Sequence, residues 1–416
     1  MKKLLIAGLA VILVALLMLT VATGNIFNQQ LDKIAADLAQ DPRVQVVASE
    51  QDAGWFNSQG ELTLAFSLDA RVDLLVTSQW QARHRPGWVS YQGSSQIQSD
   101  EAGGEKLNVL AELGIDPLPF HGRAGWKKAS YILDLQALTL ADDDLSIQFS
   151  GGQLEAGYEY ATGHQTGRLQ ADLFKLGGGR FNPSSLSFEE LLLNWNQQGV
   201  YPWVAGDMSF HVDRLHFKGP QGEVSFAQPY LSQNLEVTEQ EFELSLDFNS
   251  GEVRSGGRDL GKAALSLQTD DFDGQATADL LEFFSQEADW ESLSEEAMQP
   301  GLAAMNRLLE GSPGILLDHL EVSLVSPLEI KQKAEGSLRF DGQNLPTDYL
   351  NRLSSGEIAE DDLISRVRFE LLFDKINPEL LMLVGIPAFL QDESAEQQSL
   401  VWERGELRLN GQRLPF

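Results

Sequence analysis

The sequence has no cysteine among its 416 residues. It therefore forms no disulfide bridge and no thiolate zinc site, and no cysteine acts as a nucleophile. Histidine is scarce, with six residues, and the G-x-S-x-G turn of many serine hydrolases does not occur. The glycine run at residues 177–179 lacks the Lys-Ser/Thr pair that completes a phosphate-binding loop. Because no catalytic motif is present, we expect a protein that is not an enzyme and holds no cofactor.

Positive charge is also in short supply. The chain has 30 lysines and arginines against 61 aspartates and glutamates, a formal net charge of −31 at pH 7. Such a surface repels nucleic acid and anionic lipid headgroups by simple Coulomb interaction. We therefore expect no nucleic-acid partner, and a well-solvated acidic surface is the simplest explanation of the composition.

Long hydrophobic runs are limited to one, at the N-terminus. After Lys2 and Lys3, no charged residue occurs from Leu4 through Gln30. A signal-peptide core spans roughly 7–15 apolar residues, whereas a membrane-spanning helix needs about 20. The length predicts a single transmembrane anchor over residues 1–24. Its core residues are Leu4, Leu5, Ile6, Val11, Ile12, Leu13, Leu16, Leu17 and Leu19.

Cleavage of this segment is the alternative. Ala22-Thr23-Gly24 has small residues at the spacing that a signal peptidase accepts, so a cut before Asn25 stays open. In both cases the rest of the chain is exported. We expect the N-terminus in the cytoplasm and the bulk of the protein in the periplasm, because the positive flank of an anchor stays in the cytoplasm.

Alternation of polar and apolar residues dominates from Val44 to about Thr277, which is the period of β-strands. Clear examples are Glu61–Val76, Tyr131–Leu140, Asp207–Phe217 and Glu241–Phe248. Glycine-rich and polar turns separate them, among them Gly103-Gly104 and Asp142–Asp144. Many such strands predict an antiparallel meander with one buried face and one wet face.

After the long β-rich stretch, helical spacing begins beyond Asp273. It predicts helices at Ala278–Ala288 and Pro300–Gly311, the second with Pro300 in its first turn. A helix is also expected from Asn28 to Ala39, ended by Asp41-Pro42. The later segments are predicted in the order Leu317–Gly342 (strand), Pro346–Leu353 (helix), Leu363–Phe373 (strand) and Asn377–Gly385 (helix).

These patterns give the predicted architecture. The fold class is α+β and mainly antiparallel β, with an N-terminal transmembrane helix followed by a large β-rich periplasmic body that carries a helical insertion. We divide the chain into the anchor at residues 1–24, a β-rich region at 25–275 and a helix-plus-strand region at 276–416, packed on the same body.

Two stretches contain residues of the kinds that bind metal ions. His211, Asp213 and His216 lie close in sequence, but on a strand His216 points to the face opposite His211. The acidic stretch Asp270–Gly274 lacks the glutamate that closes a calcium loop. We therefore predict no metal site.

Three stretches together resemble the YdgA-like family, inner-membrane-anchored envelope proteins of Gram-negative bacteria with unknown function. The first is Gly54, Trp55, Phe56 and Ser58 before the first long strand. The second is the pair of helical segments that leads into a strand through Gly311-x-Pro313, and the third is the closing hairpin with Asn410-Gly411. The family's His-Gly-Pro-Phe stretch is not evident, since residues 118–122 have its elements in another order. The resemblance implies an uncleaved anchor.

The predicted function is a membrane-anchored, non-enzymatic binding or scaffold protein of the cell envelope. Its partners would be the inner membrane, through the N-terminal helix, and an envelope protein or lipid. One alternative is a carrier of lipid or another hydrophobic ligand in an apolar groove of the sheet. Another is an envelope hydrolase without a recognisable motif. An uncovered strand edge would favour the partner, and a continuous apolar trough would favour the carrier.

Overall fold

The computed structural model describes residues 2–39, 44–67, 72–101, 107–141, 145–178, 184–200, 203–220, 222–286, 294–325, 330–374 and 397–414. The chain divides into two compact units. The first unit comprises residues 1–175 and 192–201, and the second comprises residues 176–191 and 202–416. The predicted boundary near residue 275 lies inside the second unit, where the chain passes from strand to helix.

The first unit is an antiparallel meander. Its strands pair in the order β1 (Val44–Ala53), β2 (Asn57–Ser67), β3 (Val72–Arg85), β4 (Trp88–Glu101), β6 (Leu118–Gly125), β7 (Lys128–Leu135), β10 (Gly152–Glu159) and β11 (His164–Gly178). Shorter elements flank them: β5 (Leu107–Asn108), α2 (Val109–Glu112), β8 (Leu138–Ala141) and β9 (Leu145–Phe149). Sequential pairing of this kind follows from strands joined by short turns.

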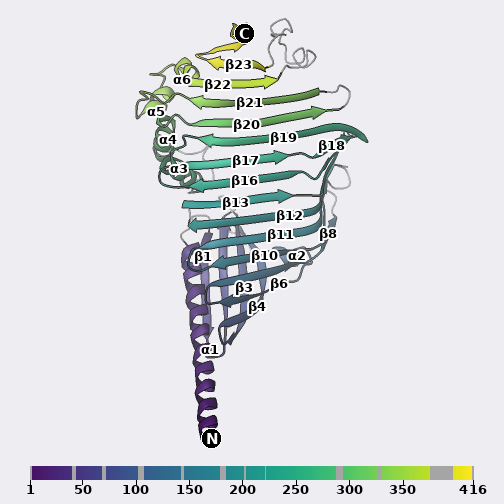
Figure 1. The fold of residues 1–416 in the computed structure, drawn as a ribbon, viewed down its shortest axis with the longest axis vertical. Coiled ribbons are helices and arrows are strands. Elements are labelled where there is room, and N and C mark those ends of the chain that lie inside the picture. The colour runs from purple at the N-terminus through teal and green to yellow at the C-terminus, as the bar shows by residue number, and fades with distance from the viewer. Residues whose placement is uncertain are drawn as a thin grey trace. The chain divides into compact units, whose positions relative to one another are not determined.

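The long helix α1 (Lys2–Leu38) packs on this sheet through its C-terminal half. Phe27 is 5% exposed and packs among Ala82, Val89 and Ala124. Its ring centroid lies 5.7 Å from those of both Trp80 and Tyr91. The helix predicted from Asn28 is thus confirmed, and it continues without a break back to Lys2 (Figure 1). Its predicted stop at Asp41-Pro42 lies outside the described residues.

The second unit is also built mainly from antiparallel strands. Its principal strands pair in the order β13 (Trp203–His211), β16 (Tyr230–Val237), β17 (Phe242–Asn249), β19 (Arg258–Asp270), β20 (Gly314–Leu324), β21 (Ile330–Phe340), β22 (Val367–Asp374), β23 (Gln397–Glu403), β24 (Glu406–Leu409) and β25 (Gln412–Arg413). A second rank, β14 (Arg214–Gly219), β15 (Gly222–Ala227) and β18 (Glu252–Ser255), links β12 (Ser185–Val200) to β19. All these pairs are antiparallel, so the predicted α+β, mainly antiparallel class is confirmed.

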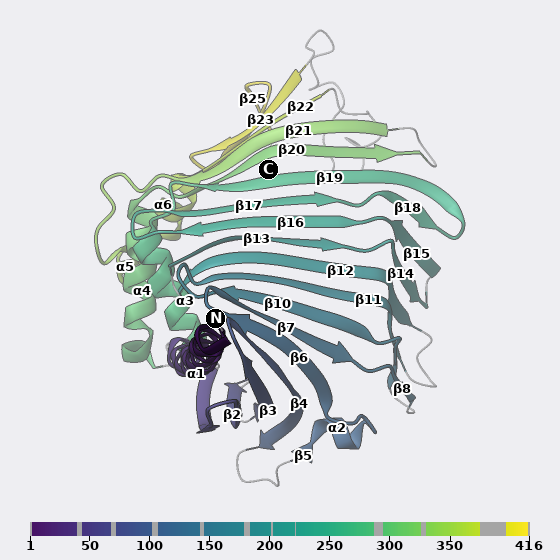
Figure 2. The same ribbon diagram turned by 60° about the horizontal axis from the view of Figure 1, so that its bottom comes forward.

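Four helices of the second unit gather at one end of its strands (Figures 1 and 2): α3 (Gly274–Gln286), α4 (Glu295–Glu310), α5 (Tyr349–Ser354) and α6 (Glu360–Arg366). Helices α3 and α4 pack on each other through Ala276, Leu280, Ala304 and Leu308. This small core is separate from the faces of the sheet. Helices α3 and α4 therefore form a small core of their own at the ends of the strands.

Two sequence predictions in this region were wrong. Helix α4 begins at Glu295, capped by the Ser294 side chain, so Pro300 lies inside the helix and not in its first turn. The segment predicted as a strand from Leu363 begins instead as α6, and β22 starts only at Val367. Acidic residues in the first turn favour a helix there because they complement its dipole. The helix predicted at Asn377–Gly385 and the turns at Gly103-Gly104 and Asp142–Asp144 lie outside the described residues.

Candidate functional site: an apolar sheet face

The most extensive feature of the second unit is a continuous apolar surface on one side of its sheet. Strand register aligns its side chains in three parallel rows. We call these rows together the apolar sheet face, and they run from β13 to β24. The first row is Phe210, Leu231, Phe248, Leu265, Leu320, Ala334 and Phe373; the second is Met208, Gln233, Leu246, Leu267, Leu317, Gly336, Leu371, Leu400 and Leu409; the third is Leu235, Leu244, Thr269, Ile315, Leu338, Phe369, Trp402 and Leu407.

The rows form because alternate residues of a strand point to the same side of a sheet. Three positions spaced two residues apart make the face about 13 Å wide. Nine strands spaced at about 4.8 Å make it ~38 Å long, measured along the curved sheet. A face of these dimensions is long enough for an extended hydrocarbon chain to lie along it.

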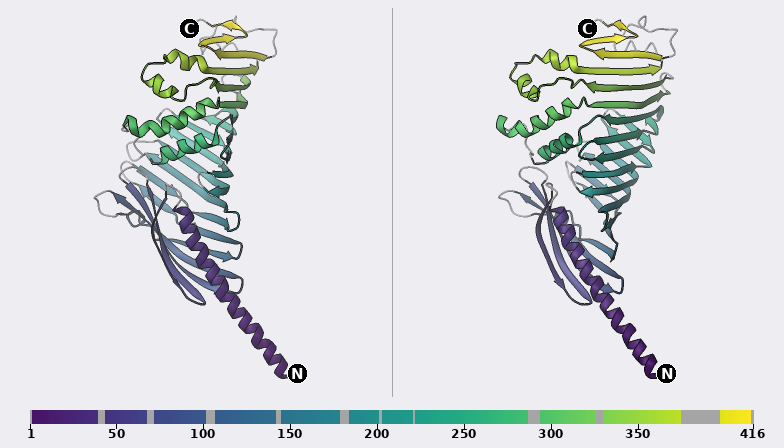
Figure 3. Two further views of the ribbon diagram at one scale, coloured as in Figure 1. Left: turned by 90° about the vertical axis from the view of Figure 1, so that its left-hand side faces the viewer. Right: turned by 60° about the vertical axis from the view of Figure 1, so that its left-hand side comes forward.

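Much of this face is accessible to solvent. Met208, Ile315 and Leu338 are 37%, 40% and 43% exposed. Most of the other members are half-buried, while Ala334, Phe373 and Leu409 are buried at the C-terminal end together with Leu414. Figure 3 shows the helices α3–α6 at one end of the strands of the second unit. The exposed members of the face leave apolar side chains in contact with water.

The reverse side of the same strands is polar. Asp247 pairs in register with Ser266, and Glu321 with Lys333, whose Nζ lies 3.5 Å from the Glu321 carboxylate. By contrast, no ionisable residue belongs to the three rows. Polar members are few. Among them, Thr269 Oγ1 accepts a hydrogen bond from the backbone N–H of Leu244 at 2.7 Å. The face can bind apolar groups by the hydrophobic effect, and it offers no acid, base or nucleophile for chemistry.

In the first unit, helix α1 covers an apolar surface of the sheet. Phe27 and Leu31 of α1 lie against Trp80 and Tyr91. Beside them a cavity of about 220 Å³ remains under the helix, lined in part by Phe120 and by the tyrosines at 91, 131 and 160. Burial raises the pKa of Tyr160 to about 12 and raises the pKa values of the other two as well. These phenols remain neutral, although Asp32, Glu50 and Glu61 also line the cavity.

The predicted anchor residues lie in the N-terminal half of α1. Leu16 and Leu17 are 46% and 43% exposed, and Leu19 is half-buried. The side chains of Leu4, Leu5, Ile6, Val11, Ile12 and Leu13 lie outside the described residues. Among the residues that the structure describes, no helix is both long enough and apolar enough to cross a membrane.

The Gly54–Ser58 motif forms the turn between β1 and β2. The Gly54 N–H donates to the Asn57 carbonyl at 2.8 Å, and Trp55 and Phe56 are 75% and 49% exposed at the tip. Ser58 is buried, with its Oγ 3.0 Å from His84 Nε2. The motif thus combines a structural hydrogen bond with two aromatic side chains that are free to contact another surface.

The other motif residues have structural roles in the second unit. Gly311 caps α4, and the Pro313 carbonyl accepts the Phe340 N–H at 3.0 Å as the chain enters β20. Asn410 and Gly411 have φ values of +51° and +79°, as in the two-residue type I′ turns that join β-hairpins, and they connect β24 with β25. None of these residues contributes a side chain to the three rows.

The histidines considered as metal ligands do not come together. His216 Nε2 lies 3.6 Å from Glu223 on β15, whereas His211 pairs in register with Tyr230 on β16. In the described part of the chain, no group of three His, Asp or Glu side chains is placed to hold a metal ion. The sequence also gave no direct sign of the apolar sheet face, because alternation marks an apolar side without telling what covers it.

Comparison with known proteins gives one match. No curated protein and no solved structure matches the chain. A family model described as a bacterial protein of unknown function (DUF945) matches residues 1–86 and 118–346, well over half of the chain. The match includes α1, the β1–β2 motif and most strands of the apolar sheet face. The chain belongs to this bacterial family, DUF945.

Proposed function

We propose that this protein binds the acyl chains of lipids on the apolar sheet face, as a membrane-anchored carrier in the bacterial envelope. The observation that supports this most directly is the set of three uncharged rows, which runs over nine strands and has exposed members on β13, β20 and β21. Each methylene group removed from water contributes about 0.8 kcal/mol, so a single acyl chain in the trough gives useful affinity. The polar reverse side keeps that face of the sheet in water.

We also propose that α1 stays attached and anchors the protein in the inner membrane, with the body in the periplasm. The uncharged segment after Lys2 and Lys3 supports this, as does the resemblance to YdgA-like proteins. The possible cleavage site lies within α1, and Thr23 there is only 2% exposed. Its hydroxyl donates to the Leu19 carbonyl and accepts hydrogen bonds from the Gly87 N–H and Trp126 Nε1, at 3.1 and 3.2 Å. Cleavage would remove these contacts.

A scaffold for another envelope protein is the second candidate. Among the described strands, β1 pairs on one side only, with β2, and Val47 on it is 51% exposed. Open strand edges recruit strands from partners. In this second proposal the function is also non-enzymatic. The partner pairs a strand with the open edge of β1 and does not bind on the apolar sheet face.

Photo-crosslinking in living cells distinguishes these two candidates. A photoreactive amino acid is placed at Leu246 or Leu267, which pair within the trough. Control variants carry it one residue away, at Asp247 or Ser266, which pair on the reverse side. We expect the purified trough variants to gain the mass of a phospholipid after illumination, and the controls not to gain it. Equal labelling on both sides would contradict lipid carriage, and protein adducts at β1 would favour the scaffold.

A further inference from the structure

Three hairpin turns of the first unit lie at the same end of its sheet. They are the β1–β2 turn at Gly54–Phe56, the β3–β4 turn at Arg85–Trp88 and the β6–β7 turn at Gly125–Lys128. Register fixes their alignment, because Ser58 pairs with Ala82, and Trp88 pairs with Gly125. We call these three turns, with the flanking Arg83 and Arg123, the hairpin collar.

The collar is positively charged in a strongly acidic protein. It contains the five basic residues Arg83, Arg85, Arg123, Lys127 and Lys128, and all five are exposed. Residues 53–60, 81–92 and 119–131 contain no Asp or Glu. The nearest acids at its borders are Asp52, beside the first turn, and Glu159, which pairs in register with Lys128. The collar therefore has a charge opposite to that of the molecule as a whole.

Exposed aromatic rings accompany this charge. Trp55, Phe56 and Trp126 are 75%, 49% and 54% exposed at the tips. Trp88 lies between two guanidinium groups, with the Arg85 and Arg123 carbons 5.0 and 5.3 Å from its ring centroid. Tryptophan, arginine and lysine side by side are typical of surfaces that sit at the headgroup level of a bilayer, where rings enter the interface and cations meet phosphates.

The position of α1 shows that this surface lies where the apolar N-terminal segment of the helix leaves the sheet. Trp126 Nε1 and the Gly87 N–H, from two of the three turns, both donate to Thr23 Oγ1. N-terminal to this point the helix leaves the strands, as Figures 1 and 3 show, and Leu16, Leu17 and Met18 become 46%, 43% and 69% exposed. The collar thus lies beside the helix at the level where its apolar segment departs from the sheet.

We propose that the hairpin collar rests on the membrane surface, with Trp55, Phe56 and Trp126 in the interface and its five cations on anionic lipid headgroups. This inference rests on the proposed anchoring of α1. It is independent of lipid binding on the apolar sheet face. The collar would fix the first unit upright on the bilayer, whereas an anchor helix alone leaves its tilt free.

The lack of cysteine makes a direct test possible. Single variants Trp55→Cys and Trp126→Cys of the full-length chain are labelled with a polarity-sensitive fluorophore and reconstituted into vesicles of phosphatidylcholine and phosphatidylglycerol. The matched control is Glu112→Cys in α2, at the far end of the same sheet, since β5 pairs with Gln98 and Ser99 of β4. Lipids carrying a nitroxide near the headgroup serve as quenchers.

We expect labels at positions 55 and 126 to shift to the blue and to be quenched several-fold more than the label at 112. Equal, weak quenching at all three positions in protein that floats with the vesicles would overturn the collar while leaving the anchor in place. Protein that does not float with the vesicles would overturn both.

The charge contribution has its own variants. The triple change Arg83→Gln, Arg85→Gln and Lys127→Gln, in the Trp55→Cys background, removes three cations of the collar. The change Lys262→Gln, Lys331→Gln and Lys333→Gln removes three from the second unit. We expect only the first to reduce quenching at position 55, and only in vesicles that contain phosphatidylglycerol. An equal loss in phosphatidylcholine alone would show that the cations do not act on anionic headgroups.

Discussion

At the scale of single residues, the contact between α1 and the sheet depends on how closely Gly24 approaches His84. A Cβ atom at position 24 would overlap the imidazole ring, so only glycine allows the helix to lie this close. His84 is 7% exposed and its Nε2 faces Ser58 Oγ. Its burial lowers the pKa of the imidazole, because a charged ring would lose its hydration there.

This lowered pKa predicts a pH dependence. The unfolded chain takes up a proton at His84 near its ordinary pKa of about 6.5, while the folded protein resists protonation to a lower pH. The stability that His84 contributes is therefore complete above about pH 6.5 and is lost as the pH falls toward the folded pKa. We expect His84→Asn to reduce this loss, measured as the urea unfolding midpoint in detergent at pH 7.5 and at pH 5.5.

The comparison must be made between variants, since protonating the many carboxylates changes stability as well. His121, which is exposed on β6, supplies the control. His121→Asn makes the same replacement at an exposed position, and we expect a smaller pH dependence in the His84 variant than in this control. If both variants behave alike, His84 does not couple to folding.

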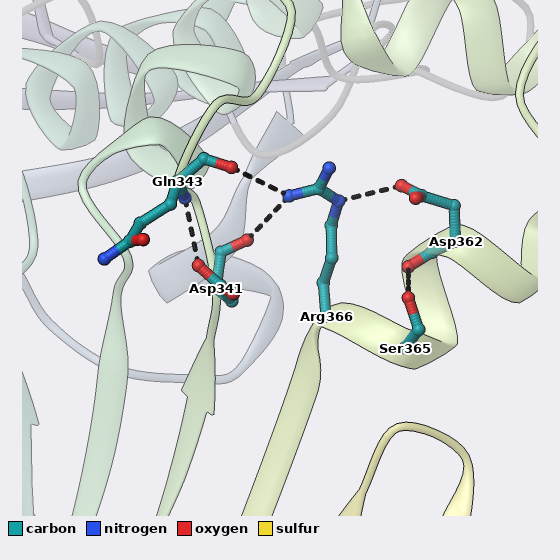
Figure 4. A network of polar contacts seen from close by, with 5 residues as sticks. All are labelled: Asp341, Gln343, Asp362, Ser365 and Arg366. Carbon is teal, nitrogen blue, oxygen red and sulfur yellow. Dashed lines mark hydrogen bonds and ion pairs between the residues drawn. The ribbon is translucent and has the colours of Figure 1, made fainter.

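At the scale of secondary-structure elements, Arg366 holds the end of α6 in place (Figure 4). Its Nε donates to the Asp362 carboxylate at 2.8 Å, and its Nη1 donates to the carbonyls of Asp341 and Gln343 at 3.1 and 3.2 Å. Its guanidinium carbon also lies 5.5 Å from the ring centroid of Tyr349 in α5. The hydrogen bond from Arg366 lowers the pKa of Asp362. One side chain thus connects two helices with the end of β21.

We expect Arg366→Ala to destabilise the second unit by about 2 kcal/mol, because it removes charge-assisted hydrogen bonds and leaves two carbonyls without their donor. Arg368→Ala is the control, since that side chain is 55% exposed and bonds only Glu370 among the described residues. It should cost less than about 0.5 kcal/mol. Equal effects in urea unfolding would show that the Arg366 contacts do not stabilise the fold.

The same helix shows the limit of prediction at this scale. Alternation correctly predicted β-structure up to β19, but it missed strand ends, since Glu61–Val76, Tyr131–Leu140 and Asp207–Phe217 each span two strands. It failed at residues 363–366, where an acidic first turn and the Asp362–Arg366 pair favour a helix that runs directly into β22. Pro300 was misplaced for a related reason: the Ser294 cap starts α4 at Glu295, five residues before the predicted start at Pro300.

At the scale of the whole molecule, the acidic surface repels itself. With a formal net charge of −31, added salt should stabilise the fold by screening this repulsion. We expect the urea midpoint to rise smoothly with NaCl and most steeply below about 0.15 M, where the Debye length is still longer than ~8 Å. The same curve should follow with KCl. A stoichiometric, saturating response to calcium at low concentration would contradict simple screening.

The candidate sites also become visible only at this scale. Leu244, Leu246 and Phe248 alternate with polar residues in the sequence, yet the apolar sheet face forms because neighbouring strands align such residues in register. Trp55 and Trp126 are 71 positions apart in the chain, as their residue numbers show, and share one end of a sheet through pairings that composition does not reveal. Single-sequence patterns specify the face of a strand, and pairing decides what that face meets.

The neighbour-to-neighbour order of the strands has a kinetic consequence. The pairs β16–β17, β20–β21 and β23–β24 are joined by short connections, so each of these hairpins can form without closing a long loop. The pairs β19–β20, β21–β22 and β22–β23 join strands that lie further apart in the chain, and closing those longer loops costs more entropy. The hairpins can therefore form first, and the longer-range pairs then join them into one sheet.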